Sequence, residues 1–101
     1  MKVENMTNSR GNKVRNQFII REEENEMSGN AVEYFQSYET IIVKRDKFRA
    51  GEMDRQVWLD VNSWNYRSRT TSKYRNQFLG ETTKDTERKI KDGTYTLTDL
   101  N

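Results

Sequence analysis

The stretch Arg55–Gly80, RQVWLDVNSWNYRSRTTSKYRNQFLG, changes periodicity part-way along its length and thereby decides the predicted fold class. In its first part, Arg55–Asn62, apolar side chains recur at every second position, a period typical of a β-strand. In its second part, several hydroxyl residues precede Tyr74 and Phe78, which lie four positions apart and therefore share one face of a helix. The stretch predicts a strand followed by a helix.

Both ends of this first helix carry residues that are common at helix termini. Ser68, Thr70 or Thr71 can cap the N-terminus, because a side-chain oxygen accepts a hydrogen bond from an otherwise unpaired backbone N–H. Gly80 fits the left-handed position just beyond the C-terminus. The helix is therefore predicted to end at or just before Gly80.

A second helix and a last strand complete the chain. The segment Thr82–Asp85 resembles a capping box and Gly93 closes the stretch, so a short helix is predicted between them. Ile90 is its one strongly apolar residue, which places this helix on the surface. The segment Thr94–Leu100 alternates again and predicts a strand at a sheet edge.

Two β-like stretches precede Arg55. The segment Val14–Arg21 predicts a strand with Phe18 and Ile20 on one face. The longest β-like stretch is Ala31–Arg45, and apolar residues occur on both of its faces. We therefore expect one strand that bends or bulges near Gln36–Ser37.

Together these elements predict an α+β fold in the order β-β-β-α-α-β. Short connections, including a turn at Ala50–Gly51, favour an antiparallel meander of the first three strands. We expect an antiparallel sheet of about four strands, with two short helices between strands 3 and 4. Residues 1–13 are polar and aperiodic, so a flexible N-terminal arm is expected before a single small domain over residues 14–101.

The composition excludes several classes of function. The 101-residue chain contains no cysteine and no histidine, which excludes disulfides, the usual zinc sites and Ser-His-Asp or Cys-His nucleophile systems. The acidic run at residues 22–26 lacks the spacing of a calcium loop, and the glycines form no phosphate-binding loop. We predict no catalytic residue, no metal site and no cofactor. No apolar run approaches the roughly 20 residues of a membrane span, so a cytoplasmic protein without membrane contact is expected.

The most informative region for function is Val61–Gly80. The chain contains 16 acidic residues, but none of them falls in this region. Cations bind phosphates and acidic groups, while aromatic side chains stack on bases or contact proteins. The candidate partner-binding residues are Trp64, Tyr66, Arg67, Arg69, Lys73 and Arg75. The other interpretation is a capped, solvated helix whose cations confer only solubility and whose aromatic residues belong to the core.

A second basic cluster lies upstream of this region. It consists of Lys44, Arg45, Lys47 and Arg49. The two clusters form one basic surface if they share a side of the fold, and otherwise each is an ordinary solvated face.

The tetrapeptide RNQF occurs twice, at residues 15–18 and 75–78. The flanking sequences share little, so chance similarity is favoured over internal duplication. Phe18 and Phe78 are both expected to anchor the core, the first by strand periodicity and the second by helix periodicity.

Four segments carry a resemblance to known proteins: FQSYETII at residues 35–42, WNY at 64–66, RTTSKYRNQFLGE at 69–81 and LTDLN at 97–101. Together they resemble a family of small bacteriophage-encoded proteins of unknown function, over roughly residues 30–101. In that pattern Tyr is followed directly by Ser-Arg-Thr-Thr, whereas Arg67 intervenes here. The resemblance implies a phage origin and no particular activity, and it favours a binding module.

Two functional hypotheses of different classes follow. The first is a non-enzymatic phage-type protein that binds a host macromolecule in the host cytoplasm, as a protein inhibitor or modulator. The alternative is a nucleic-acid-binding protein whose Arg/Lys cluster at residues 67–75 contacts phosphates. A monomer or a weak homodimer is expected, the latter through the predicted edge strand Thr94–Leu100.

Overall fold

The computed structural model describes residues 1–23, 31–47 and 56–101. The strands within these residues are β1 (Lys2–Thr7), β2 (Lys13–Glu23), β3 (Ala31–Ser37), β4 (Thr40–Lys47), β5 (Val57–Asp60) and β6 (Tyr95–Thr98). The helices are α1 (Val61–Asn65), α2 (Arg69–Leu79) and α3 (Thr83–Lys91). The predicted turn at residues 50–51 lies outside the described part of the chain.

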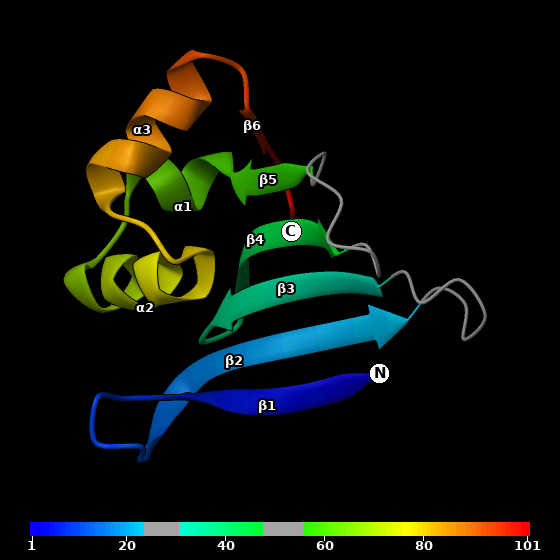
Figure 1. Ribbon diagram of the computed structural model, residues 1–101, viewed down its shortest axis with the longest axis vertical. Coiled ribbons are helices and arrows are strands. Elements are labelled where there is room, and N and C mark those ends of the chain that lie inside the picture. Colours follow the sequence, from blue (N-terminus) through cyan, green and yellow to red (C-terminus); the bar gives the residue numbers. More distant parts are fainter. Residues whose placement is uncertain (24–30, 48–55) are drawn as a thin grey trace.

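The strands form one sheet in the order β1-β2-β3-β4-β5-β6, with each strand beside its neighbour in sequence (Figure 1). The first five strands pair antiparallel, whereas β6 pairs parallel to β5. A parallel neighbour requires a crossover connection, and α1, α2 and α3 supply it. The predicted α+β class is confirmed, but the sheet is mixed and six-stranded rather than antiparallel and four-stranded.

The predicted long strand over residues 31–45 is in fact two strands. A two-residue turn at Tyr38–Glu39 separates β3 from β4, and Tyr38 has a left-handed φ of 57°. The Tyr38 N–H donates to Asn16 O (2.6 Å) and the Gln36 side-chain amide donates to Tyr38 O (2.7 Å). Neither Tyr38 nor Glu39 is a common turn residue, so the local pattern does not predict this turn. One of the bonds that hold it comes from Asn16 of β2.

The bend or bulge predicted within one strand near Gln36–Ser37 does not occur there, because β3 ends at Ser37 and the irregularity of the β3–β4 ladder has its extra residue on β4. The β3–β4 register shifts between Phe35 and Gln36, where Ile42 is the additional residue on β4. Because a bulge changes which side chains face the core, the neighbours Ile42 and Val43 are both buried.

Residues 1–13, expected to form an arm, contain the edge strand β1. Val3 pairs with Ile20 and Asn5 with Phe18 in an antiparallel ladder. Met6 is buried in the core cluster. The side-chain pattern did not predict this strand, because its residues are mostly polar. The strand is held by hydrogen bonds between backbone groups, which the side-chain pattern does not show.

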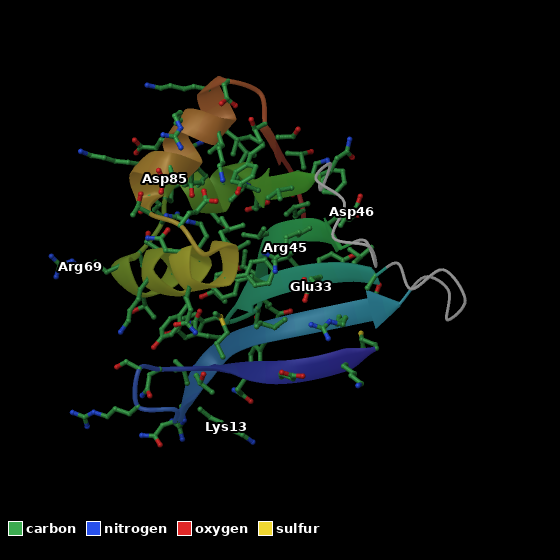
Figure 2. The ribbon with its side chains drawn as sticks, viewed as in Figure 1. Lys13, Glu33, Arg45, Asp46, Arg69 and Asp85 are labelled. Carbon is green, nitrogen blue, oxygen red and sulfur yellow. The ribbon has the colours of Figure 1, made fainter. Side chains whose placement is uncertain are left out.

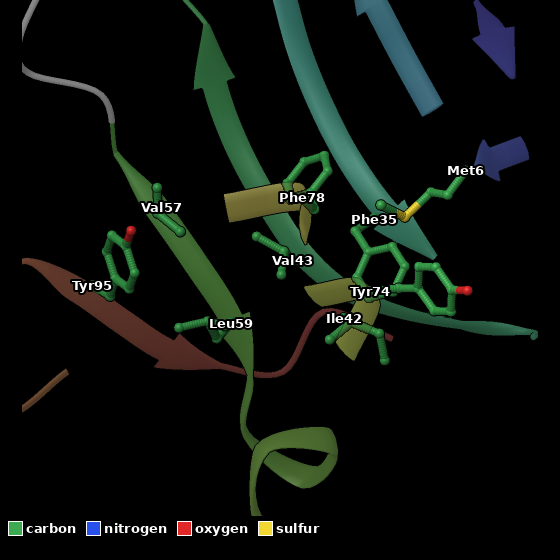
Figure 3. Packing of buried hydrophobic residues seen from close by; sticks show 9 residues of the cluster. All are labelled: Met6, Phe35, Ile42, Val43, Val57, Leu59, Tyr74, Phe78 and Tyr95. Atoms are coloured by element: carbon green, nitrogen blue, oxygen red, sulfur yellow. The ribbon is translucent and has the colours of Figure 1, made fainter. Parts of the chain in front are cut away.

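The core lies between the sheet and α2 (Figure 3). Phe35, Val43 and Leu59 are cross-strand neighbours and therefore face the same side of the sheet. Tyr74 and Phe78 of α2 pack against this side, and the ring centroids of Phe35 and Phe78 are 6.0 Å apart. Both aromatic residues of α2 therefore lie in the core, as their i,i+4 spacing predicted.

The two phenylalanines of the RNQF copies lie in different environments. Phe78 belongs to the core as predicted, whereas Phe18 is half-buried and lies outside the core cluster. Ile19 instead faces the helices, since it pairs with Phe35. Apolar residues occur on both faces of this strand, so the sequence pattern alone did not show which face packs against the helices.

Local capping signals explain the helix ends. Ser68 Oγ accepts from Thr71 N (3.1 Å) at the start of α2, and Gly80 follows its end with a φ of 70°. Thr82 Oγ1 accepts from Asp85 N (3.2 Å), and the Asp85 carboxylate accepts from Thr82 N (3.2 Å). The predicted caps of both helices are therefore confirmed.

Helix α1 was not expected, because alternation predicted a strand as far as Asn62. The strand ends at Asp60, whose carboxylate accepts from Ser63 N (3.0 Å) and caps α1. This cap turns Val61 and Asn62 into the first residues of a helix.

Candidate functional site

The region without acidic residues forms α1, α2 and the connection between them, and Trp64 lies at its centre. The guanidinium carbon of Arg67 is 4.2 Å from the centroid of a Trp64 ring, and that of Arg75 is 4.7 Å away. Such contacts between a guanidinium group and an indole are attractive. Trp64 therefore contacts two other predicted partner-binding residues, Arg67 and Arg75.

Arg75 is part of the interior. Its side chain is about 1% exposed, and its Nη2 donates to Asn76 Oδ1 and to Thr83 Oγ1, both at 3.0 Å. Burial, together with the positive charge of Arg67, lowers the pKa of Arg75 to about 10, so the side chain remains cationic at neutral pH. Arg75 therefore joins α2 to α1 and α3 and presents no surface to a partner.

Arg67 is also engaged within the chain. Its Nη1 donates to Trp64 O, and its Nη2 lies 3.6 Å from Glu87 Oε1. The exposed members of the predicted set are Tyr66, Arg69 and Lys73, and Figure 2 shows Arg69 extending away from the start of α2. The structure thus separates the predicted site into a supporting group and an exposed group.

The two described members of the second basic cluster, Lys44 and Arg45, do not form one surface with the first cluster. Lys44 and Arg45 are consecutive on β4 and project to opposite faces, since Lys44 lies 4.9 Å from the Trp58 ring centroid while Arg45 lies 4.1 Å from that of Phe78. Arg45 also pairs with the buried Glu33 (3.1 Å; Figure 2). Arg49 and the side chain of Lys47 lie outside what the structure describes.

Arg45 and Glu33 belong to a charged group on the helix-bearing face of the sheet. Arg21 Nη2 lies 2.9 Å from Glu33 Oε2, and Arg45 Nη1 donates to Phe78 O (3.1 Å). A cavity of about 170 Å³ lies against these side chains at the end of α2. The group therefore fixes the end of α2 above β2, β3 and β4.

A hollow of about 220 Å³ opens between the β3–β4 turn and the α1–α2 connection. Its lining, which we call the hydroxyl hollow, consists of Ser37, Tyr38, Thr40, Ile42, Ser63, Tyr66, Arg67, Ser68 and Thr71. Tyr38 is 56% exposed and Tyr66 is 87% exposed. The sequence singled out Tyr66 but not Tyr38, because nothing local indicated that the β3–β4 turn lies beside the start of α2.

A third polar group fixes the α2–α3 connection to β6. Glu81 Oε1 accepts from Tyr95 Oη (2.6 Å) and from Lys89 Nζ (2.9 Å), and Glu81 Oε2 accepts from Thr86 Oγ1 (2.7 Å). Burial and the bond to Glu81 raise the pKa of Tyr95 to about 12. Burial alone would raise the pKa of Glu81, but the bonds from Tyr95, Lys89 and Thr86 lower it below its ordinary value. These hydrogen bonds to Glu81 stabilise the crossover that connects β5 to β6.

Within residues 1–23, 31–47 and 56–101, no three Asp, Glu, His or Cys side chains gather into a group that could hold a metal ion. Among the helices that the structure describes, none has the length and apolar character needed to cross a membrane.

Comparison with protein-family models gives one result that covers most of the chain. A family of unknown function, DUF8033, matches residues 1–93. The chain belongs to this family. No curated protein and no solved structure matched. The DUF8033 match includes β1 and every residue of the hydroxyl hollow, so both lie within the unit that defines the family.

Proposed function

We propose that this DUF8033 protein is a non-enzymatic binding module that engages a partner protein through the hydroxyl hollow and its two flanking tyrosines. The observation that carries the proposal is the exposure of Tyr38 and Tyr66 on the rim of one hollow. Tyrosine supplies a large and rigid contact area at a small entropic cost, and it is enriched in protein interfaces. Arg69 and Lys73 add exposed cations on the first turns of α2.

The resemblance to bacteriophage-encoded proteins supports a proposal about the origin of the partner. We take the chain to be phage-encoded and its partner to be a host protein in the host cytoplasm, which it inhibits or modulates. We further propose that it acts as a monomer or a weak homodimer, the latter through the edge strand β6. Sedimentation of the purified chain tests that assembly state.

A protein partner is favoured over nucleic acid by what the cations contact. Arg67, Arg75 and Arg45 are engaged within the chain, which leaves Arg69 and Lys73 as the exposed cations of the first cluster. Binding to a nucleic-acid backbone draws on several phosphate contacts at once. Two exposed cations beside two tyrosines fit the rim of a protein interface better.

Affinity capture from host lysate tests the proposal. The tagged chain is compared with Tyr66→Ala and Arg69→Ala, and with Lys84→Ala, which removes an exposed cation from α3. We expect a protein that survives nuclease treatment, binds at least about tenfold more weakly to Tyr66→Ala, and binds Lys84→Ala normally. Each variant is first shown to unfold at the wild-type denaturant concentration.

Two results would overturn the proposal. A partner released by nuclease, with affinity that falls steeply as salt rises, would establish the nucleic-acid alternative. A partner captured equally well by Tyr66→Ala and Arg69→Ala would place the interface elsewhere on the molecule.

A further inference from the structure

The strand β1 forms one edge of the sheet and has a neighbour on one side only. It stands first in the sheet order, so β2 is the one described strand that pairs with it (Figure 1). The backbone N–H and C=O groups of alternate β1 residues therefore point away from β2. Lys2, Val3 and Glu4 are all exposed, and the strand contains no proline. An edge with these properties is a template for a further strand.

The two charged residues of β1 have no oppositely charged residue directly across from them in the chain. Lys2 lies opposite Arg21 of β2, and Arg21 is itself paired with Glu33 (2.9 Å). Glu4 lies opposite the apolar Ile19. In the part of the chain that the structure describes, neither Lys2 nor Glu4 forms an ion pair. Like charges directly opposite each other destabilise a sheet, so Lys2 favours an acidic neighbour on its other side.

The order Lys2-Val3-Glu4 is complementary to itself in an antiparallel pair. When a twofold axis passes beside Val3, each Val3 lies opposite the same residue of a second copy. Lys2 of each copy then lies opposite Glu4 of the other. Residues directly opposite share a face of the sheet, with Cβ atoms about 4.5–5.5 Å apart, so the opposite charges attract. The contact contains two such Lys–Glu pairs, and its twofold symmetry closes the assembly after two copies.

The position of α2 leaves room for this second copy. The helix approaches β1 at Thr7, where Gln77 donates to Thr7 O (2.9 Å). Thr7 lies about 13 Å along the strand from Val3. Antiparallel strands run in opposite directions from the axis, so the two α2 helices lie over opposite ends of the contact. The hydroxyl hollow has no β1 residue in its lining and stays open to a partner protein.

We infer that β1 pairs antiparallel with β1 of a second copy of this chain, in the register that places Lys2 opposite Glu4. The two six-stranded sheets then form one continuous sheet. The inference goes beyond the proposed function, in which the weak homodimer uses β6. It favours the opposite edge because β1 has six residues against four in β6 and carries the complementary charges. A contact along one strand is small beside the roughly 1,200–2,000 Å² of standard interfaces, so the dimer is weak.

Reversal of the two charges tests this register. Sedimentation equilibrium of the wild type at concentrations up to about 1 mM should show a reversible dimer. Lys2→Glu places a second carboxylate opposite Glu4, and Glu4→Lys places a second cation opposite Lys2. Each variant alone should therefore dimerise at least about tenfold more weakly. An equimolar mixture of the two variants restores both pairs of opposite charges and should dimerise within about threefold of the wild type.

Matched changes at other exposed positions provide the controls. Lys84→Glu on α3 and Glu39→Lys in the β3–β4 turn make the same changes of charge and should leave the dimer unchanged. Unfolding of every variant at the wild-type denaturant concentration establishes that each is folded.

Three results would overturn the inference. They are a wild type that remains monomeric over this range, a dimer that neither charge reversal weakens, and a mixture that dimerises no better than the separate variants. The second result would leave β6 as the contact, as in the proposed function. Capture of the partner protein is a separate measurement, so its dependence on Tyr66 bears on the proposed function alone.

Discussion

Asp60 shows how much one side chain fixes in this fold. Its carboxylate accepts hydrogen bonds from Ser63 N (3.0 Å), Ser63 Oγ (2.8 Å) and Leu100 N (3.0 Å), and the residue is buried. It therefore ends β5, caps α1 and holds the C-terminal segment. Burial alone would raise the pKa of Asp60, but the bonds from Leu100 and Ser63 lower it below its ordinary value.

The lowered pKa of Asp60 predicts a specific dependence of stability on pH. A carboxylate whose pKa is lower in the folded state stabilises the fold above its unfolded pKa of about 3.9, and this stabilisation is lost as the pH falls through the folded pKa. We expect Asp60→Asn to reduce the free energy of unfolding by about 1–3 kcal/mol at pH 7, and by progressively less below pH 4. Urea unfolding at pH 7, 5 and 3 measures this difference.

The exposed Asp99 provides the control for this experiment. Asp99→Asn should change the free energy of unfolding by less than about 0.5 kcal/mol at every pH. An effect of Asp60→Asn that is equally large at pH 3 and pH 7 would contradict the role assigned to its charge.

At the scale of elements, the three helices of the crossover depend on Arg75. Its guanidinium group contacts the Trp64 ring of α1 and donates to Thr83 of α3. Nothing in the local sequence distinguishes Arg75 from Arg69 as a cation in α2. Their difference in burial arises because one side of α2 faces α1 and α3, which pack there only in the folded chain.

Arg75 is therefore predicted to act in stability rather than in binding. Arg75→Ala should lower the free energy of unfolding by about 2–4 kcal/mol, since it removes a buried side chain and leaves Thr83 without this bond. Arg69→Ala, at an exposed position of the same helix, should change it by less than about 0.5 kcal/mol. Guanidinium chloride unfolding measures both. If Arg75→Ala is as stable as the wild type but fails to capture the partner, Arg75 acts in binding and the prediction is wrong.

In the whole molecule, both terminal segments of the chain are hydrogen-bonded to residues far from them in sequence. Gln77 of α2 donates to Thr7 O at the end of β1 (2.9 Å). The Asn101 side chain accepts from Ile41 N (2.8 Å) and donates to Ile41 O (2.9 Å), beside the bulge in β4. Residues from the first and last segments therefore complete the same fold.

Removal of β1 tests whether the N-terminal segment is structural. A chain that begins at Lys13 loses the ladder with β2 and the buried Met6, so we expect a loss of at least about 2–5 kcal/mol and self-association through the newly exposed edge of β2. Denaturant unfolding and sedimentation measure these effects. Deletion of the exposed Met1 alone is the control. If the shorter chain has the same free energy of unfolding as the full chain, residues 1–12 do not contribute to stability and behave as an arm.

Local sequence signals were sufficient to predict the features that depend on neighbours within a few residues. Ser68 and Gly80 delimit α2, the Thr82–Asp85 box starts α3, and the period of four aligns Tyr74 with Phe78. Each signal works because donor and acceptor, or two packed side chains, lie within about one helical turn of each other. The absence of histidine and cysteine likewise limits the available chemistry before any fold is known.

Which side chains are available to a partner depends instead on contacts between residues far apart in sequence. The turn at Tyr38 is held by Asn16 of another strand, and Arg75 is buried by α1 and α3. The hydroxyl hollow arises where Ser37 of β3 meets Thr71 of α2. Pairing and burial of this kind join residues far apart in sequence, so no local pattern encodes them. The region that bears the candidate site could be predicted from the sequence, whereas the exposure of its residues depends on the fold.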